Sequence, residues 1–145
     1  MDKKQAAARV VEAKERLDLS WKDIAAGLGT SPAWTVAALL GNHPVPDDVA
    51  ARAVALLELD TETGAALRRQ PYRVTDPTLL SDPTIYRFHE ALNVYGPAIK
   101  ELIHEEFGDG IMSAINFNLS VERRPHDGGD RVRVVFDGKF LKYEW

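Results

Sequence analysis

Apolar side chains recur at helical spacing through the first seventy residues of the chain. Val10, Ala13 and Leu17 share one face of a first predicted helix. The segment Ser20-Trp21-Lys22-Asp23 has the pattern of a capping box, so we expect a second helix to begin there and to end at Gly29. This pattern predicts a bundle of short helices for the first half of the chain.

Three further helix starts are expected in the same half. Ser31-Pro32 places proline at the first position of a helix that ends near Gly41, where its missing N–H costs nothing. Asp47 and Asp60 are the predicted caps of two later helices, the last of which ends near Arg69.

Residues 20–41 have the spacing of a helix-turn-helix. Base recognition needs polar side chains on the second helix, above all Arg, Lys, Asn or Gln. The predicted second helix, 32–40, contains none of these four residue types. We therefore interpret the segment as a repressor-like bundle used for packing or assembly, with no nucleic-acid partner. The alternative is a transcription regulator with a C-terminal dimerisation domain, which would bind DNA in a salt-sensitive way.

The amino-acid composition of the chain changes after residue 70. Prolines are spaced through the next dozen residues, which predicts a non-helical, extended linker over 71–82. The chain is therefore expected to consist of a helical domain over 1–70, this linker, and a second domain over 83–145.

The second domain begins with a helical pattern. Asp82-Pro83 repeats the cap-plus-proline start, and the helix is expected to reach about Val94. Gly96-Pro97 is predicted to break it, and a further helix then extends to Phe107. Gly108-Asp109-Gly110 is the expected end of that helix.

The pattern then switches to period two. Residues 111–121 alternate as a strand, 127–130 form a turn, 131–136 form a second strand, and Asp137-Gly138 is predicted to turn the chain again. So small a hairpin cannot bury its own apolar face. We expect a second chain to cover it, burying Ile115, Phe117, Leu119 and Val134. The predicted fold class is α+β and mostly helical, with a C-terminal helix and antiparallel-strand module that interlocks with a second chain.

Composition narrows the range of functions. The 145 residues carry a net charge of −4, which argues against a protein whose main task is neutralising phosphates. There is no cysteine, so disulfides and thiolate catalysis are excluded. No stretch approaches the roughly 20 apolar residues needed to cross a bilayer, and the first residues lack the apolar core of a signal peptide. We expect a cytoplasmic protein without a membrane partner.

Polar residues with a possible joint purpose gather in the second domain. Arg87 and Glu90 lie one helical turn apart and share a face, which is also the spacing of an ordinary surface ion pair. Ser113 interrupts an apolar strand face, where its hydroxyl needs either a local backbone partner or a pocket. The 108–110 segment is either a plain helix stop or a set of N–H groups open to a small anion.

Metal and nucleotide chemistry find no support in the sequence. The four histidines are scattered, and no glycine-rich phosphate loop follows a strand. We expect neither a metal nor an organic cofactor. The histidines are His43, His89, His104 and His126.

Several of these segments together resemble one family. The segments 82–88 and 107–117, with Glu90 and Tyr95-Gly96, closely resemble the cyanase (cyanate hydratase) family, and the resemblance extends over most of 19–141. Cyanases carry a repressor-like helical bundle that is not known for reading DNA. The resemblance therefore also accounts for the first half of the chain.

The resemblance implies a reaction and a site. Arg87, Glu90 and Ser113 stand where the family has its catalytic arginine, glutamate and serine. Cyanases convert cyanate and bicarbonate to carbamate and carbon dioxide, and the carbamate then gives ammonia and more carbon dioxide. They form rings of five dimers with active sites shared between subunits. Two departures are His89, where many relatives have an aromatic residue such as tyrosine, and the terminus 142–145.

These residue types suit that chemistry. Cyanate and bicarbonate are both anions that repel each other, and Arg87 offers a fork of permanently charged donors. Ser113, with backbone N–H groups near Gly110 and Ile111, is expected to hydrogen-bond the charge that develops when a bicarbonate oxygen attacks the cyanate carbon. Glu90 is expected to orient Arg87, with proton handling as its second possible role. The remaining alternative is a family member that has lost activity and serves as a scaffold.

Overall fold

The computed structural model describes residues 1–144, so Trp145, the last residue of the predicted 83–145 domain and of the divergent terminus, lies outside the description. Two compact units are present. One contains Met1–Arg73 with Leu119–Val135, and the other contains 74–118 with 136–145. The predicted division into 1–70, 71–82 and 83–145 stays a prediction.

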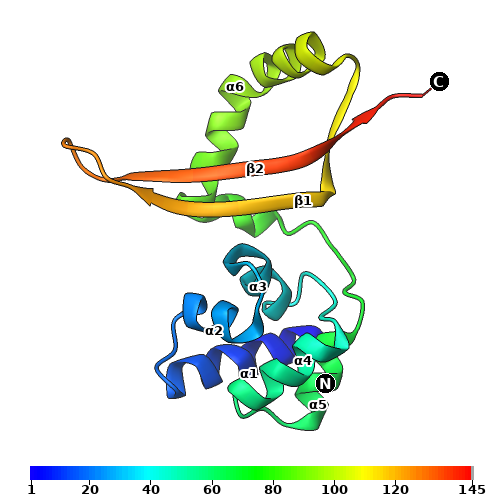
Figure 1. The fold of residues 1–145 in the computed structure, drawn as a ribbon, viewed down its shortest axis with the longest axis vertical. Coiled ribbons are helices and arrows are strands. Elements are labelled where there is room, and N and C mark those ends of the chain that lie inside the picture. The colour runs from blue at the N-terminus through cyan, green and yellow to red at the C-terminus, as the bar shows by residue number, and fades with distance from the viewer. Residues whose placement is uncertain (145) are drawn as a thin grey trace. The chain divides into compact units, whose positions relative to one another are not determined.

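Five helices form the first half of the chain, as the hydrophobic pattern predicts (Figure 1). They are α1 (Lys3–Arg16), α2 (Trp21–Leu28), α3 (Pro32–Leu39), α4 (Asp47–Leu56) and α5 (Thr61–Arg68). Their apolar faces meet in one core, because each helix is too short to be stable without such burial. The fully buried side chains of this core include Val10, Ile24, Leu28, Leu39, Leu57 and Leu67.

The predicted helix starts are mostly confirmed at the level of single hydrogen bonds. The Ser20 hydroxyl accepts from the backbone N–H of Asp23, and the Asp23 carboxylate accepts from the N–H of Ser20. Asp60 accepts from the N–H of Thr63 and caps α5. The cap predicted at Asp47 is wrong by one residue, because α4 has Pro46 at its N-cap and Asp47 inside its first turn.

Lys3 ties the start of α1 to two distant backbone segments. Its Nζ donates to the carbonyl of His43 at 2.6 Å and to the carbonyl of Leu67 at 2.7 Å. The His43 carbonyl follows α3, and the Leu67 carbonyl lies in the last turn of α5. One side chain therefore ties three helices together. Burial lowers the pKa of Lys3.

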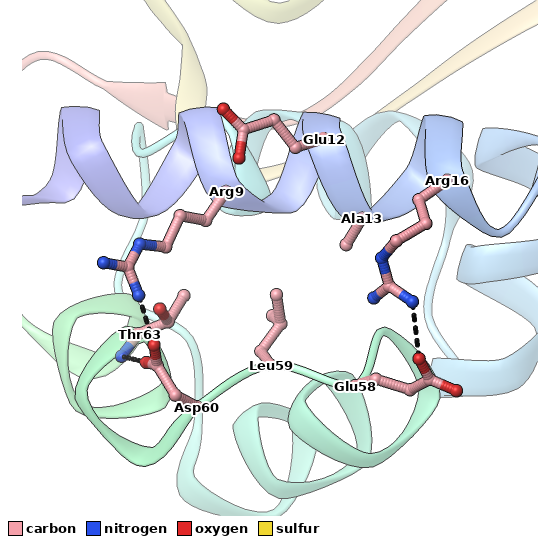
Figure 2. Close-up of a pocket in the computed structure, with 8 residues that line it drawn as sticks. All are labelled: Arg9, Glu12, Ala13, Arg16, Glu58, Leu59, Asp60 and Thr63. Carbon is pink, nitrogen blue, oxygen red and sulfur yellow. Dashed lines mark hydrogen bonds and ion pairs between the residues drawn. The ribbon is translucent and has the colours of Figure 1, made fainter.

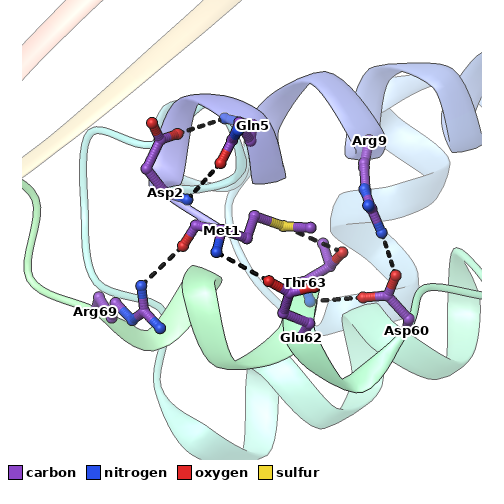
Figure 3. A network of polar contacts seen from close by, with 8 residues as sticks. All are labelled: Met1, Asp2, Gln5, Arg9, Asp60, Glu62, Thr63 and Arg69. Carbon is purple, nitrogen blue, oxygen red and sulfur yellow. Dashed lines mark hydrogen bonds and ion pairs between the residues drawn. The ribbon is translucent and has the colours of Figure 1, made fainter.

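A second set of polar contacts joins α1 to α5 (Figure 3). The amino group of Met1 forms an ion pair with Glu62 at 2.9 Å, and the Met1 carbonyl accepts from Arg69 at 2.8 Å. Arg9 of α1 donates to the carboxylate of Asp60. The network lies at the rim of the core, where it aligns the two helices that the core brings together.

The linker is only partly extended, which corrects the prediction that residues 71–82 are non-helical. Residues 70–76 have no regular structure, but Pro77–Ser81 forms the short 3-10 helix η1. The Asp76 side chain accepts from the N–H of Thr78 and caps this turn. A proline at the first helical position is favourable, so the proline-rich composition permits the turn.

The helix of the second half is continuous. α6 spans Pro83–Phe107, 25 residues, and contains Pro97 in its interior. The predicted break at Gly96-Pro97 is therefore wrong. Proline removes one backbone hydrogen bond and bends a helix without always ending it, and Figure 1 shows α6 bent along its length. The predicted start is confirmed, since Asp82 accepts from the N–H groups of Thr84 and Ile85.

The hairpin consists of two long strands, β1 (Gly110–Arg124) and β2 (Arg131–Lys142). The second turn predicted at Asp137-Gly138 is wrong, because β2 passes through both residues without interruption. Gly138 lies directly against Met112 and Ser113 of β1. The predicted fold class, α+β and mostly helical with an antiparallel hairpin, is confirmed.

The second half exposes an unusual amount of apolar surface. No residue of α6 is buried, and Ile115 of β1 is 91% exposed. A hairpin and a helix with so little cover are marginal in water. Within residues 1–144 Ile115 stays exposed, so its predicted burial by a second chain stays a prediction. No helix between Met1 and Glu144 is long and apolar enough to cross a bilayer.

Replacing Lys3 tests the tie between the first helices. Lys3→Met keeps a long side chain but leaves two carbonyls without their charged donor, so we expect the free energy of unfolding to fall by about 1.5–3 kcal/mol. Lys4→Met makes the same charge change at an exposed position of the same helix and should cost less than about 0.5 kcal/mol. Urea unfolding followed by circular dichroism measures both. Equal losses would mean that the two hydrogen bonds contribute nothing specific.

The stability of this half should also depend on the protonation of His43. Arg73 Nη2 lies 3.2 Å from His43 Nδ1, and because arginine can only donate, Nδ1 is the unprotonated acceptor. Burial lowers the pKa of His43 below its usual 6.5, and the charges of Arg73 and Lys3 lower it further. Protons therefore bind the unfolded chain more readily than the folded one.

We expect this contribution to be complete above about pH 6.5 and to be lost as the pH falls through the lowered pKa. Urea midpoints between about pH 8 and pH 5 measure it. A His43→Gln variant, which cannot titrate there, should lose less stability over this interval than the unaltered chain. Identical slopes for the two proteins would contradict the assignment.

Candidate active site

Arg87 and Glu90 form an ion pair on the first turns of α6. Arg87 Nη1 lies 2.8 Å from Glu90 Oε2, and the two side chains are 75% and 52% exposed. An exposed pair of this kind stabilises a helix by only about 0.3–0.5 kcal/mol, because water screens the charges. The pair mainly orients the Arg87 side chain. The Glu90 carboxylate holds one guanidinium nitrogen, and the remaining donors of Arg87 can bind another anion.

Ser113 is the one predicted catalytic residue that the chain buries, with 7% of its surface exposed. Its Oγ accepts from the backbone N–H of Ile115 at 3.1 Å and from that of Asn116 at 2.9 Å. A hydroxyl has two acceptor positions and one proton. Both acceptor positions are therefore in use, and the proton is the part of the group that remains available.

These two hydrogen bonds also show that β1 is irregular at Ser113. In a regular strand, successive N–H groups point to opposite edges. Here the N–H groups of two consecutive residues, Ile115 and Asn116, donate to one oxygen. Side-chain oxygens of serine commonly compete with the ladder in this way. The sequence left open whether Ser113 has a local backbone partner or lines a pocket, and the structure gives it the local partner.

Gly110 and Ile111, the predicted sources of N–H donors, differ in their surroundings. Gly110 is buried, and a Cβ there would lie 2.3 Å from the carbonyl oxygen of Leu141 and 2.6 Å from the ring of Phe140. Ile111 is 48% exposed. The turn before them uses Gly108 at a φ of 90°, a conformation that favours glycine. Whether these two N–H groups meet a ligand stays a prediction.

The chain brings Arg87 and Glu90 together but does not join them to Ser113. Within residues 1–144, no hydrogen bond or ion pair links Ser113 to either side chain. An open hollow of about 470 Å³ lies on the hairpin, and Ser113 is not among its lining residues. Its lining residues are Asn116, Phe117, Asn118, Asp137, Gly138 and Lys139.

The pairing of Asp137-Gly138 with β1 beside Ser113 was not expected from the sequence. Asp137-Gly138 read as a turn, because the pair is a common turn signal. A strand glycine can also mark a close approach of two backbones, and that alternative signal was present in the sequence.

Another hollow lies between α1 and the start of α5, with a volume of about 510 Å³ (Figure 2). Its two arginines are already neutralised, Arg9 by Asp60 and Arg16 by Glu58. Hydrogen bonds from Thr63, with Arg9 close by, hold the pKa of Asp60 below its usual range. Paired charges of this kind align helices and leave little free charge to bind a ligand.

Potential metal ligands do not gather in the part of the chain that the structure describes. No group of three or more histidine, cysteine, aspartate or glutamate side chains is close enough to hold an ion there. His104 instead faces Asp109, with Nδ1 3.6 Å from the carboxylate. The second helix of the helix-turn-helix-like segment, α3, matches the residues expected from the sequence and carries no cationic side chain.

Comparison with known proteins covers both halves of the chain. The family profile described as "Cyanate hydratase, N-terminal" matches residues 3–71, and "Cyanate lyase C-terminal domain" matches 77–145. A protein of Mycolicibacterium vanbaalenii named cyanate hydratase is 54% identical over all of this chain and 95% of its own length. One from Thiobacillus denitrificans with the same name is 46% identical over 99% of this chain and 98% of its own.

A solved structure agrees with these sequence relatives. The crystal structure of cyanase from T. urticae superposes with a TM-score of 0.85 at 35% identity, covering 94% of this chain and 96% of the other. Similarity of this extent reaches every element from α1 to β2. The chain belongs to the cyanate hydratase (cyanate lyase) family.

Proposed function

We propose that this chain catalyses the bicarbonate-dependent decomposition of cyanate. Cyanate, bicarbonate and one proton give carbamate and carbon dioxide, and carbamate with a second proton gives ammonia and carbon dioxide. The proposal is supported by the full-length similarity to proteins named cyanate hydratase. The observation that links this reaction to a site is the geometry of the Ser113 hydroxyl. Its two acceptor positions are filled, and its proton is available for donation to a bound anion.

Ser113 acts in this proposal as a hydrogen-bond donor. Attack by a bicarbonate oxygen on the cyanate carbon places negative charge on the nitrogen and oxygen of the adduct. A buried donor that is already oriented stabilises such charge without having to reorganise. A nucleophilic serine would need a free lone pair and a nearby base, and within the described chain its oxygen is held by two N–H groups instead. The N–H groups of Gly110 and Ile111 are proposed as further donors to the bound anions.

Arg87 supplies the positive charge that two anions need in order to meet. Its guanidinium stays protonated throughout, and Glu90 holds one of its nitrogens at 2.8 Å. Glu90 is therefore proposed first as an orienting partner of Arg87. Formation of carbamate also consumes a proton, so a carboxyl group at this position has a second possible task in delivering it.

The site is proposed to be completed by other copies of the chain. Arg87 is 75% exposed, and α6 has no buried residue, so neither the site nor its supporting helix is enclosed within one chain. Following the resemblance to cyanases, we propose a ring of five dimers with shared sites. The protein is proposed to act in the cytoplasm with cyanate and bicarbonate as its ligands, and without nucleic acid, membrane or cofactor.

Ammonia release from purified protein tests the reaction. With cyanate present, we expect ammonia only when bicarbonate is supplied after carbon dioxide has been stripped from the buffer, because bicarbonate is a reactant. Ammonia formation that ignores bicarbonate would contradict the mechanism. Absence of ammonia from a folded oligomer in both conditions would instead favour the scaffold alternative.

Replacing Arg87 tests the anion site. Arg87→Lys keeps the charge but loses the planar fork and its pairing with Glu90, so we expect kcat to fall by roughly 10²-fold or more. The oligomer should persist, because the pair is exposed and stabilises little. Steady-state ammonia release and size-exclusion chromatography measure the two properties. A Lys100→Arg variant makes the reverse exchange at an exposed position of the same helix and should leave turnover unchanged. Turnover retained in Arg87→Lys would remove Arg87 from the mechanism.

A further inference from the structure

We propose that Gly138 of β2 is a positioning residue for Ser113. Its lack of a side chain lets β2 approach the backbone of Ser113 so closely that the serine hydroxyl is held in its double-acceptor geometry. The proposal rests on the proposed function, because it concerns the residue through which Gly138 would affect turnover. It adds a residue of the opposite strand to the site.

The close approach is measured by the space that a side chain at Gly138 would need. An ideal Cβ built there lies 2.4 Å from the carbonyl oxygen of Ser113, and 2.5 Å from Cγ and 3.1 Å from Sδ of Met112. Contacts of a real Cβ essentially never fall below 3.0 Å, so one of these groups would have to move. The Met112 side chain can rotate away, but the Ser113 carbonyl belongs to the backbone.

Movement of the Ser113 backbone acts directly on its hydrogen bonds. The Oγ of Ser113 meets two N–H groups, at 3.1 Å and 2.9 Å, within the same short bend of β1. A shift of more than half an ångström lengthens one or both beyond good hydrogen-bond geometry. The hydroxyl then regains a free lone pair and a rotating proton, and its proton is no longer aimed.

Space, and not backbone conformation, is what requires glycine at this position. Gly108 and Gly129 have φ values of 90° and 114°, where any side chain is strained. Gly138 is not among the residues with positive φ. An alanine could adopt its backbone conformation, so the effect of Gly138→Ala reports the contact with Ser113 and Met112 alone.

A second contact fixes the other end of the segment. Gly110 packs against the ring of Phe140 and the carbonyl of Leu141, and the rings of Phe107 and Phe140 stack with centroids 5.2 Å apart. The segment 110–113 is thus set by β2 at two points. The contact at Gly110 does not involve Gly138. A side chain added at position 138 would therefore displace the Ser113 end of the segment and leave the Gly110 end in place.

The test compares turnover and amide exchange in matched variants of the full protein. Gly138→Ala is expected to lower kcat by roughly 10²-fold with KM changed less than about threefold, since a misplaced donor mainly affects the transition state. Gly128→Ala of the same hairpin, whose Cβ would meet only His126 at 3.5 Å, is expected to keep full turnover. Hydrogen exchange of the peptide containing Ile115 and Asn116 should become faster in Gly138→Ala and equally faster in Ser113→Ala.

Two double variants separate positioning from general damage to the hairpin. In the Ser113→Ala background, Gly138→Ala should reduce turnover no further, because its effect passes through the missing hydroxyl. Met112→Ala with Gly138→Ala relieves the side-chain contact but not the carbonyl contact, so turnover should stay low. It also offers a less crowded variant for the same exchange measurement if Gly138→Ala does not fold.

Each contrary result has a distinct meaning. Unchanged exchange at Ile115 and Asn116 in a folded Gly138 variant, losses that multiply with Ser113→Ala, or turnover restored by Met112→Ala would overturn the positioning role. Full turnover in Ser113→Ala would refute the proposed function of Ser113. The exchange measurement would still decide whether Gly138 holds it.

Discussion

Burial of apolar surface holds the helical half together, and the same force has little to act on in the other half. The core cluster of α1–α5 lies entirely between Ala6 and Leu67, and its members are almost completely removed from water. Along α6 the helix pattern is just as regular, yet no residue is buried. Helix propensity alone does not stabilise a segment of this kind in water. The polar details of the second half therefore depend on whatever surface completes its burial.

This division explains why the candidate site looks incomplete in a single chain. Arg87 and Glu90 lie on the uncovered helix, where water weakens every electrostatic interaction they make. Ser113 lies where the hairpin folds against itself and is already enclosed. The attraction between a guanidinium and an anion becomes stronger when water is removed from around them. The Ser113 hydroxyl is thus already oriented by the backbone of its own chain, whereas the Arg87 side chain remains exposed to water.

Local signals in the sequence were good predictors where a few neighbouring residues decide the structure. Ser20 and Asp23 form the predicted capping box, and Asp82 caps α6 as expected, because both depend on hydrogen bonds within three residues. The same kind of signal failed at Pro97, where the rest of α6 outweighs one missing hydrogen bond.

Contacts between residues that are far apart along the chain could not be predicted from the sequence. Asp137-Gly138 has the composition of a turn, and only its pairing with β1 reveals a strand in close contact with Ser113. The i, i+3 spacing predicted the contact of Arg87 with Glu90, and the structure contains it. Their catalytic role came from resemblance to a family and stays a prediction, because the contact alone is also that of an ordinary surface ion pair.

The confinement of the core to residues before Arg73 has a consequence for how the protein is made. A ribosome adds residues from the N-terminus at about 5–20 per second, and early domains can fold while later ones are still being synthesised. All side chains of the main core have been synthesised before α6 is translated. The first half can thus fold while the hairpin is still being synthesised. This order limits the time during which an uncovered, aggregation-prone surface is attached to an unfolded chain.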